Sequence, residues 1–222
     1  MNKKLLPRWF FYFCTFGALG LLASNPAFSA EKLIADTTPD FRASVAQGKS
    51  DAITYPAKDP ARGNWSSGTM PDQTYEISKY TLFEKRSFNV PGFDVYGYTH
   101  LASGPLPWIG QDCGIPKVKT LQPAIRRWTS NFDGKIRISG EVGMDTSHQP
   151  LGGTGTRVSL YIDGVEKYTK DLVGTDGTQF KFDLPEQEIK KGTIVDFVIS
   201  ARDATSKIAN FTGQIYEISA NP

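Results

Sequence analysis

The stretch GKIRISGEVGM, residues 134–144, decides the fold, because its apolar and polar side chains alternate with a period of two. The apolar side of the alternation holds Ile136, Ile138, Gly140 and Val142. The polar side holds Lys135, Arg137, Ser139 and Glu141. Such alternation is typical of a strand with one face buried and the other in water.

Similar stretches recur on both sides of this strand. We expect strands in residues 74–83, 92–101, 124–132, 157–172, 178–184, 193–201 and 214–219. Turn residues separate them, and the pair Asp163-Gly164 predicts a hairpin turn within 157–172. No amphipathic helix of ten residues competes with this pattern. The sequence therefore predicts an all-β fold, an antiparallel sandwich or barrel of roughly eight or nine short strands in one domain.

Residues 1–29 have the composition of a secretory signal peptide. Lys3, Lys4 and Arg8 precede an apolar run over 9–23, and small residues follow Pro26. Cleavage fits best after Ser29 or after Ala30. The run is shorter than the roughly 20 residues that span a bilayer, so an uncleaved anchor is the weaker alternative and we expect no membrane span after cleavage. The Lys-rich start favours a bacterial protein that is secreted or periplasmic.

Residues 30–72 are poor in pattern, and prolines interrupt them at positions 39, 56, 60 and 71. Because proline breaks both helices and strands, we expect an extended leader here, which becomes ordered near Trp65. The predicted organisation is a signal peptide over 1–29, a leader over 30–72 and a β-sandwich domain over 73–222.

Charge and cysteine content exclude several classes of protein. The formal net charge is +2 over 222 residues, and the signal segment carries three basic residues and no acid, so the mature chain is close to neutral. A nearly neutral domain argues against nucleic-acid binding. Only Cys113 remains after cleavage, which excludes a disulfide scaffold. Its expected role is a small buried apolar side chain, with an intermolecular disulfide as the alternative.

The strands after residue 92 resemble a known class of domain in their turns as well as their alternation. The shared features are Trp128, Asp133-Gly134, the loop Gly152-Gly153-Thr154-Gly155, Asp163-Gly164 and Gly192-Thr193-Ile194, with LPWIGQD at 106–112 before them. This pattern resembles a jelly-roll domain of secreted bacterial proteins, similar to non-catalytic carbohydrate-binding modules, over roughly residues 92–219. The resemblance implies a jelly-roll-like sandwich that binds glycans on its loops or on a concave face.

The same resemblance implies that the sandwich is stabilised by a bound calcium ion. Weak candidate ligands are the loop carboxylates of Asp145, Asp176 and Asp203. Asp145 and His148 share a loop, but two such residues without a third are a poor signal for a transition metal. No other cofactor is expected.

Glycan binding by side chains uses flat aromatic rings with polar groups beside them. Trp108 lies in a Pro- and Gly-rich loop next to Gln111 and Asp112, and it is the first candidate, although it could instead plug the end of the sandwich. Further candidates share one face of a predicted strand by alternation: Tyr96, Tyr98 and His100. Trp128 is expected in the core.

Three functions remain open at this point. The first is a non-enzymatic protein that binds carbohydrate or an envelope glycan. The second is a structural or protein-interaction component of the envelope, with residues 124–142 and 193–201 offering a strand edge to a partner. The third is a polysaccharide-degrading enzyme of the lyase kind, in which Tyr96, Tyr98 and His100 would act. The carboxylates of Glu141 and Glu217 are expected on solvated faces, which argues against a glycosidase pair.

Overall fold

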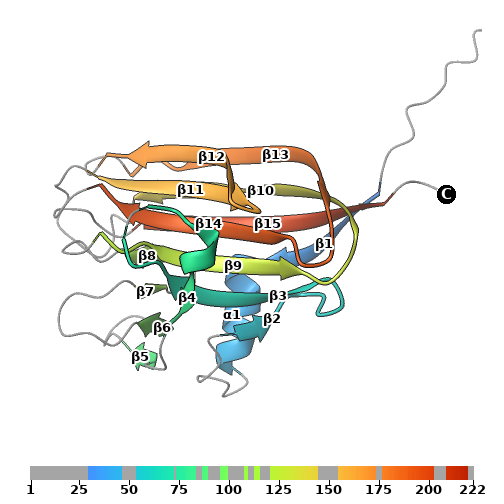
Figure 1. Ribbon diagram of the computed structural model, residues 1–222, viewed down its shortest axis with the longest axis horizontal. Helices are drawn as coiled ribbons and strands as arrows, with labels where there is room; N and C mark the ends of the chain where they lie inside the picture. Colours follow the sequence, from blue (N-terminus) through green and yellow to red (C-terminus); the bar gives the residue numbers. More distant parts are fainter. Residues whose placement is uncertain are drawn as a thin grey trace, which may run out of the picture.

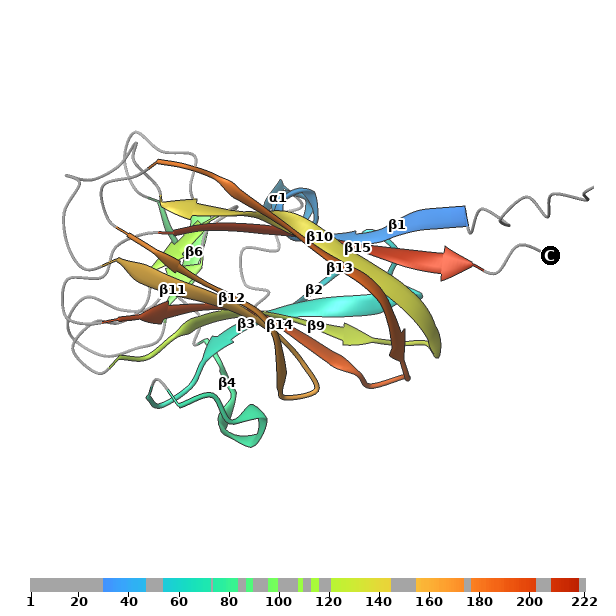
Figure 2. The same ribbon diagram turned by 90° about the horizontal axis from the view of Figure 1, so that it is seen from above.

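Two antiparallel sheets lie face to face and enclose a hydrophobic core (Figure 1 and Figure 2). The computed structural model describes residues 30–46, 54–72, 74–83, 87–89, 96–99, 108–109, 113–115, 121–144, 155–173, 177–202 and 209–219. The predicted all-β antiparallel sandwich is confirmed, and the described strands do not close into a barrel.

The first sheet contains eight strands among the described residues. They are β1 (Ala30–Asp36), β5 (Ser87–Asn89), β6 (Tyr96–Thr99), β7 (Trp108–Ile109), β8 (Cys113–Ile115), β10 (Gly134–Met144), β13 (Phe180–Ile189) and β15 (Ala209–Ser219). Their spatial order is β13-β10-β15-β8-β7-β6-β5, and β1 also pairs with β15.

The second sheet contains seven strands in the same described part of the chain. They are β2 (Thr54–Pro56), β3 (Gly63–Thr69), β4 (Thr81–Leu82), β9 (Ala124–Ser130), β11 (Thr156–Ile162), β12 (Val165–Leu172) and β14 (Ile194–Ala201). Their order is β12-β11-β14-β9-β3-β2, with β4 on β3. Two helices complete the described elements, α1 (Thr37–Ala46) and the short 3-10 helix η1 (Ile77–Lys79).

The alternation of β10 is observed as predicted. Ile136, Ile138 and Val142 are fully buried between the sheets, whereas the polar side chains between them face outward. The predicted hairpin between β11 and β12 is also present, since Asp163 and Gly164 both have positive φ, at 46° and 85°. Two such residues match the right-handed twist of the flanking strands.

A pair of glycines brings β10 and β15 close to the core aromatics. Gly140 faces Gly213 directly across the two strands. A Cβ added to Gly213 would lie 2.1 Å from the ring of Phe197, and one added to Gly140 would lie 2.7 Å from the ring of Phe182. Both rings are almost fully buried. The missing side chains therefore leave the space into which these rings pack.

The described parts of residues 30–72 belong to the sandwich and do not form a separate leader. β1 runs antiparallel to β15, and β3 runs antiparallel to β9 in the other sheet. Trp65 of β3 is fully buried, as is Trp128 of β9, which was expected in the core. Pro56 is compatible with this arrangement because it lies at the end of β2, the edge strand of its sheet, where a missing N–H is tolerated.

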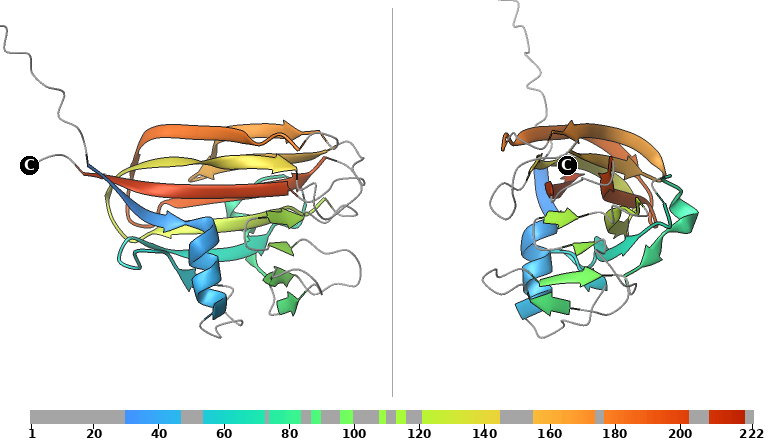
Figure 3. Two further views of the ribbon diagram at one scale, coloured as in Figure 1. Left: turned by 180° about the vertical axis from the view of Figure 1, so that it is seen from behind. Right: turned by 90° about the vertical axis from the view of Figure 1, so that its left-hand side faces the viewer.

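The structure also contains a ten-residue helix that the sequence pattern did not indicate, although this helix is not amphipathic. α1 spans ten residues and has Pro39 as its third residue, in the first turn, where the backbone N–H has no partner within the helix. Its apolar residues do not gather on one face, so no helical period is visible in the sequence. Figure 1 and Figure 3 show α1 running crosswise to the strands at the end of β1. Phe41 of the helix packs edge-on against Tyr55 of β2, with ring centroids 5.7 Å apart.

The strands proposed to offer an edge to a partner are interior strands. β9 pairs with β14 and β3, β10 pairs with β13 and β15, and β14 pairs with β11 and β9. Both backbone edges of each strand are therefore occupied. Among the described residues, no helix is long and apolar enough to cross a membrane. The predicted signal peptide, residues 1–29, lies outside the described residues.

Candidate functional site

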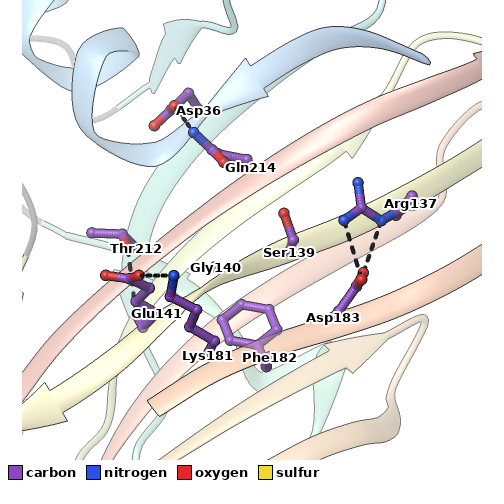
Figure 4. Close-up of a pocket in the computed structure, with 10 residues that line it drawn as sticks. All are labelled: Asp36, Arg137, Ser139, Gly140, Glu141, Lys181, Phe182, Asp183, Thr212 and Gln214. Atoms are coloured by element: carbon purple, nitrogen blue, oxygen red, sulfur yellow. Dashed lines mark hydrogen bonds and ion pairs between the residues drawn. The ribbon is translucent and has the colours of Figure 1, made fainter. Parts of the chain in front are cut away.

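A polar groove of about 530 Å³ crosses the outer face of the first sheet, over β1, β15, β10 and β13 (Figure 4). Its lining residues are Asp36, Arg137, Ser139, Gly140, Glu141, Lys181, Phe182, Asp183, Thr212 and Gln214. Most of these are the outward residues of the alternating strands. The groove therefore follows directly from the pattern that also builds the core.

The strand register arranges the lining side chains in rows across the sheet. In the central row, Ser139 lies between Gln214 on one side and Asp183 on the other. Asp36 of β1 continues this row next to Gln214. In a neighbouring row, Glu141 lies between Thr212 and Lys181. Four strands thus contribute polar groups to one short path, and two of them, β10 and β15, have neighbours on both sides.

Arg137 forms one end of the groove. Its Nε and Nη2 donate hydrogen bonds to the two carboxylate oxygens of Asp183, at 2.9 and 3.1 Å. Its Nη1 donates to Oε2 of Glu31 at 2.9 Å. The hydrogen bonds and charge of Asp183, together with Glu31, raise the pKa of Arg137 above its ordinary value. The guanidinium also lies 5.4 Å from the ring centroid of Tyr216. Both carboxylates therefore hold the cation in place.

A chain of hydrogen bonds fixes the side near β1. The hydroxyl of Tyr216 donates to Oε1 of Gln214 at 2.9 Å, and Nε2 of Gln214 donates to Oδ2 of Asp36 at 3.0 Å. Oδ1 of Asp36 accepts the backbone N–H of Thr38 at 3.2 Å. The Gln214 amide is thus held in one orientation before any ligand arrives.

The opposite side and the floor are less constrained. Nζ of Lys181 lies 3.5 Å from Oε1 of Glu141, and both side chains are well exposed. Ser139 lies between this pair and the Arg137 pair in Figure 4. Within the described part of the chain, its hydroxyl makes no hydrogen bond, so it can both donate to and accept from a ligand.

The polar groups that line the groove are largely paired with one another. Three lining carboxylates already have partners, which are Arg137, Lys181 and Gln214. Among the described residues, the Ser139 hydroxyl makes no hydrogen bond to a base that could activate it as a nucleophile. Those residues also contain no group of three or more His, Cys, Asp or Glu placed to hold a metal ion.

A second polar cluster lies on the outer face of the second sheet and has a different character. Arg127 donates two hydrogen bonds to the fully buried carboxylate of Asp196, at 2.8 and 2.7 Å, and Tyr75 donates a third at 2.6 Å. Tyr80 lies under the Arg127 guanidinium, 3.6 Å from ring centroid to Cζ. Burial is the first cause that raises the pKa of Tyr75, and the adjacent carboxylate adds to it. These groups satisfy one another and fasten residues 74–83 to the sheet.

The aromatic residues predicted to bind a ligand fall only partly within the described structure. Tyr96 and Tyr98 lie in β6, and Trp108 lies in β7. β6 and β7 pair through Tyr98 with Ile109 and Thr99 with Trp108, so the sheet brings these backbones together. They are separated from the groove by β8. His100, Gln111 and Asp112 lie outside the described residues, as do Asp145, Asp176 and Asp203.

Sequence reasoning missed the groove, although the alternation had placed several of its residues on polar faces. Arg137, Ser139 and Glu141 were assigned outward on one strand, and Glu141 was expected to be solvated, which the structure confirms. Gln214 and Asp36 carried no comparable signal. A search for small polar residues at outward positions of neighbouring strands would have found Ser139.

Comparison with known proteins gives likeness of fold alone. No family model and no curated protein matches the chain. Among solved structures, rabbit GITRL is 15% identical over 53% of this chain and 89% of its own, with a TM-score of 0.30. The CBM22-1 xylan-binding domain of Xyn10C from Paenibacillus barcinonensis is 11% identical over 70% and 94%, with a TM-score of 0.28. A family 35 carbohydrate binding module from Clostridium thermocellum is 15% identical over 58% and 90%, with a TM-score of 0.29.

Proposed function

We propose that this protein is an exported, non-enzymatic β-sandwich that binds carbohydrate or an envelope glycan in the groove over β10. The observation that carries the proposal is the central row of the groove. In this row the Ser139 hydroxyl, which makes no hydrogen bond among the described residues, lies between the oriented amide of Gln214 and the paired carboxylate of Asp183.

Sugar rings present hydroxyl groups at fixed angles, and a site that recognises them needs donors and acceptors that are already oriented. The Gln214 amide is held from both sides by Tyr216 and Asp36. Asp183 is held by Arg137 and retains lone pairs that can accept from a hydroxyl. Because these groups stand on paired strands, little conformational freedom is lost when a ligand binds.

Export is part of the same proposal. Residues 1–29 have signal-peptide composition, and β1 begins at Ala30. Cleavage after Ser29 would leave β1 with its full length. The mature protein would then meet glycans in the periplasm or outside the cell.

The decisive experiment combines binding with a substitution that fills the groove. Ser139→Tyr places a ring on the floor without touching the core, and Ser200→Tyr is the matched control on the outer face of β14. We expect the wild type and Ser200→Tyr to be retarded in gels that contain one of a panel of soluble polysaccharides. Ser139→Tyr should migrate freely in the same gel.

Thermal unfolding gives a second readout. A ligand at about 100 times its dissociation constant adds about 2.7 kcal/mol to stability. For a chain of this size, that raises Tm by roughly 5–10 °C. Failure of every polysaccharide to retard or stabilise the wild type would contradict the proposal and favour a role in protein interaction. Release of new sugar ends during the assay would show that the protein is an enzyme.

The aromatic residues of β6 and β7 remain a proposed second contact surface. Trp108→Ala, tested against the same panel, separates that surface from the groove. Gln111, Asp112, Tyr96, Tyr98 and His100 are the residues to substitute next if Trp108→Ala weakens binding. The calcium proposal is tested by Tm in EDTA and in calcium, with Asp145, Asp176 and Asp203 as the residues to change if Tm moves.

A further inference from the structure

The groove carries a pattern of charge that restricts which glycans it can accept. Its lining contains the carboxylates of Asp36, Glu141 and Asp183, and Glu31 reaches Arg137 from β1. The cations in this set are Arg137 and Lys181. Carboxylates therefore outnumber cations, and the local field is negative.

Arg137 cannot readily receive an acidic ligand. Three of its N–H groups are already used, two toward Asp183 and one toward Glu31. A ligand carboxylate would have to use the two N–H groups that remain, close to both of these carboxylates, or displace one of them. Two carboxylates at close range repel each other unless one takes up a proton.

Lys181 offers only weak compensation. Its side chain is 84% exposed and lies 3.5 Å from Glu141. An exposed ammonium of this kind is strongly hydrated and contributes little to binding energy. Ligand hydroxyl groups are not repelled by these carboxylates. They can donate hydrogen bonds to the carboxylates and can donate to or accept from Ser139 and Gln214.

We infer that the groove binds uncharged polysaccharides and rejects those that carry carboxylates, such as polyuronates. This inference rests on the proposed function of the same groove, and it names the class of ligand. Specificity would come from a repulsive element, the two carboxylates that occupy Arg137.

The test uses probes that share a backbone and differ in charge. Hydroxyethyl cellulose is compared with carboxymethyl cellulose, dextran with carboxymethyl dextran, and methyl-esterified polygalacturonate with polygalacturonate. For the pair that contains a ligand, we expect the wild type to bind the neutral member at least about tenfold more tightly at low salt. Added salt should narrow this ratio by screening the repulsion, with little effect on the neutral member.

A gain of binding is the sharper readout. The double variant Glu31→Gln, Asp183→Asn releases Arg137 from both carboxylates, and it should bind the acidic member about tenfold more tightly than the wild type does. Both side chains are substantially exposed, so the fold should tolerate the change. Asp171→Asn is the matched control, because Asp171 forms the same two-pronged bond with Arg157 on the other sheet. Asp171→Asn should leave the affinities for the neutral and the acidic member unchanged.

The outcomes separate the two claims. If the wild type binds the acidic member as tightly as the neutral one, or if the double variant gains nothing, the inference on charge is overturned and the glycan-binding function stands. If no member of any pair binds to the wild type, the proposed function fails, and the inference falls with it.

Discussion

The indole Nε1 of Trp65 donates a 2.8 Å hydrogen bond to the carboxylate of Asp40, which joins the first turn of α1 to the core strand β3. The same carboxylate oxygen accepts the backbone N–H of Asp36 at 2.8 Å. Asp40 therefore sets the bend at which β1 becomes α1. Because Asp36 lies at that bend and contacts Gln214, this buried contact also positions one wall of the groove.

Replacing Asp40 by alanine should destabilise the protein and weaken glycan binding together. The substitution leaves two buried N–H groups, those of Trp65 and Asp36, without an acceptor, at a cost of about 3 kcal/mol. Urea unfolding measures the loss. Asp40→Asn keeps one oxygen at this place and should lose less. If Asp40→Ala has the stability of the wild type, the bend does not depend on this carboxylate.

The titration of Asp40 should make the free energy of unfolding depend on pH. Burial raises the pKa of Asp40 above its ordinary value of 3.8, against the hydrogen bonds from Asp36 and Trp65. The folded state therefore binds this proton more tightly than the unfolded state does. The stabilisation that this proton gives the folded protein is complete below the pKa of Asp40 in the unfolded state. It is lost as pH rises through the pKa of Asp40 in the folded state.

The measurement is the free energy of unfolding of the wild type and of Asp40→Asn between about pH 3.5 and pH 7. The wild-type value minus the variant value should fall as pH rises through this window, because asparagine does not titrate. Other carboxylates titrate in both proteins and cancel in the difference. A difference that is flat or rises with pH would contradict the raised pKa.

Breaking the ion pair of the second sheet should cost far more than breaking a similar pair at the surface. Asp196 is fully buried, and Asp196→Asn leaves the Arg127 guanidinium without its anion, for an expected loss of about 3–5 kcal/mol. Asp171→Asn breaks the corresponding ion pair with the exposed Arg157 and should lower the free energy of unfolding by about 0–1 kcal/mol. Chemical denaturation measures the free energy of unfolding of both variants. Equal losses would show that burial does not determine how much an ion pair stabilises the protein.

Gly213→Ala should destabilise the sandwich although it adds only one methyl group. The methyl would overlap the ring of Phe197, which is buried among other core side chains. Overpacking of this kind costs about 1–3 kcal/mol. Ser200→Ala, at an outward position of β14, should stay within about 0.5 kcal/mol of the wild type. A Tm for Gly213→Ala equal to that of the wild type would mean that Phe197 has room to shift.

The sheets could be predicted because strands such as β10 alternate between apolar and polar residues, and this pattern is local to each strand. The inward residues of β10 are visible in sequence for this reason, and so is the Asp163-Gly164 hairpin, whose backbone needs positive φ. Residues 30–72 gave no such signal. The pairing of β1 with β15 joins Ala30 to Ser219, and no local pattern reports a contact between residues so far apart in the sequence.

The groove could not be predicted for a related reason. Its residues come from four strands, and their proximity depends on register. Asp36 reaches Gln214, 178 positions away in the sequence, because β1 and β15 pair as they do. Sequence reasoning placed Ser139 and Glu141 on a polar face, but it could not tell which other polar faces would join them.

The pairing of the first strand with the last also has a mechanical consequence. Ala30 at the start of β1 lies opposite Ser219 at the end of β15. Tension applied through these two residues would load the cross-strand hydrogen bonds one after another, as in a zipper, rather than all at once. Glu31 would leave Arg137 first and Asp36 would leave Gln214 last, so separation of β1 from β15 would remove one side of the groove.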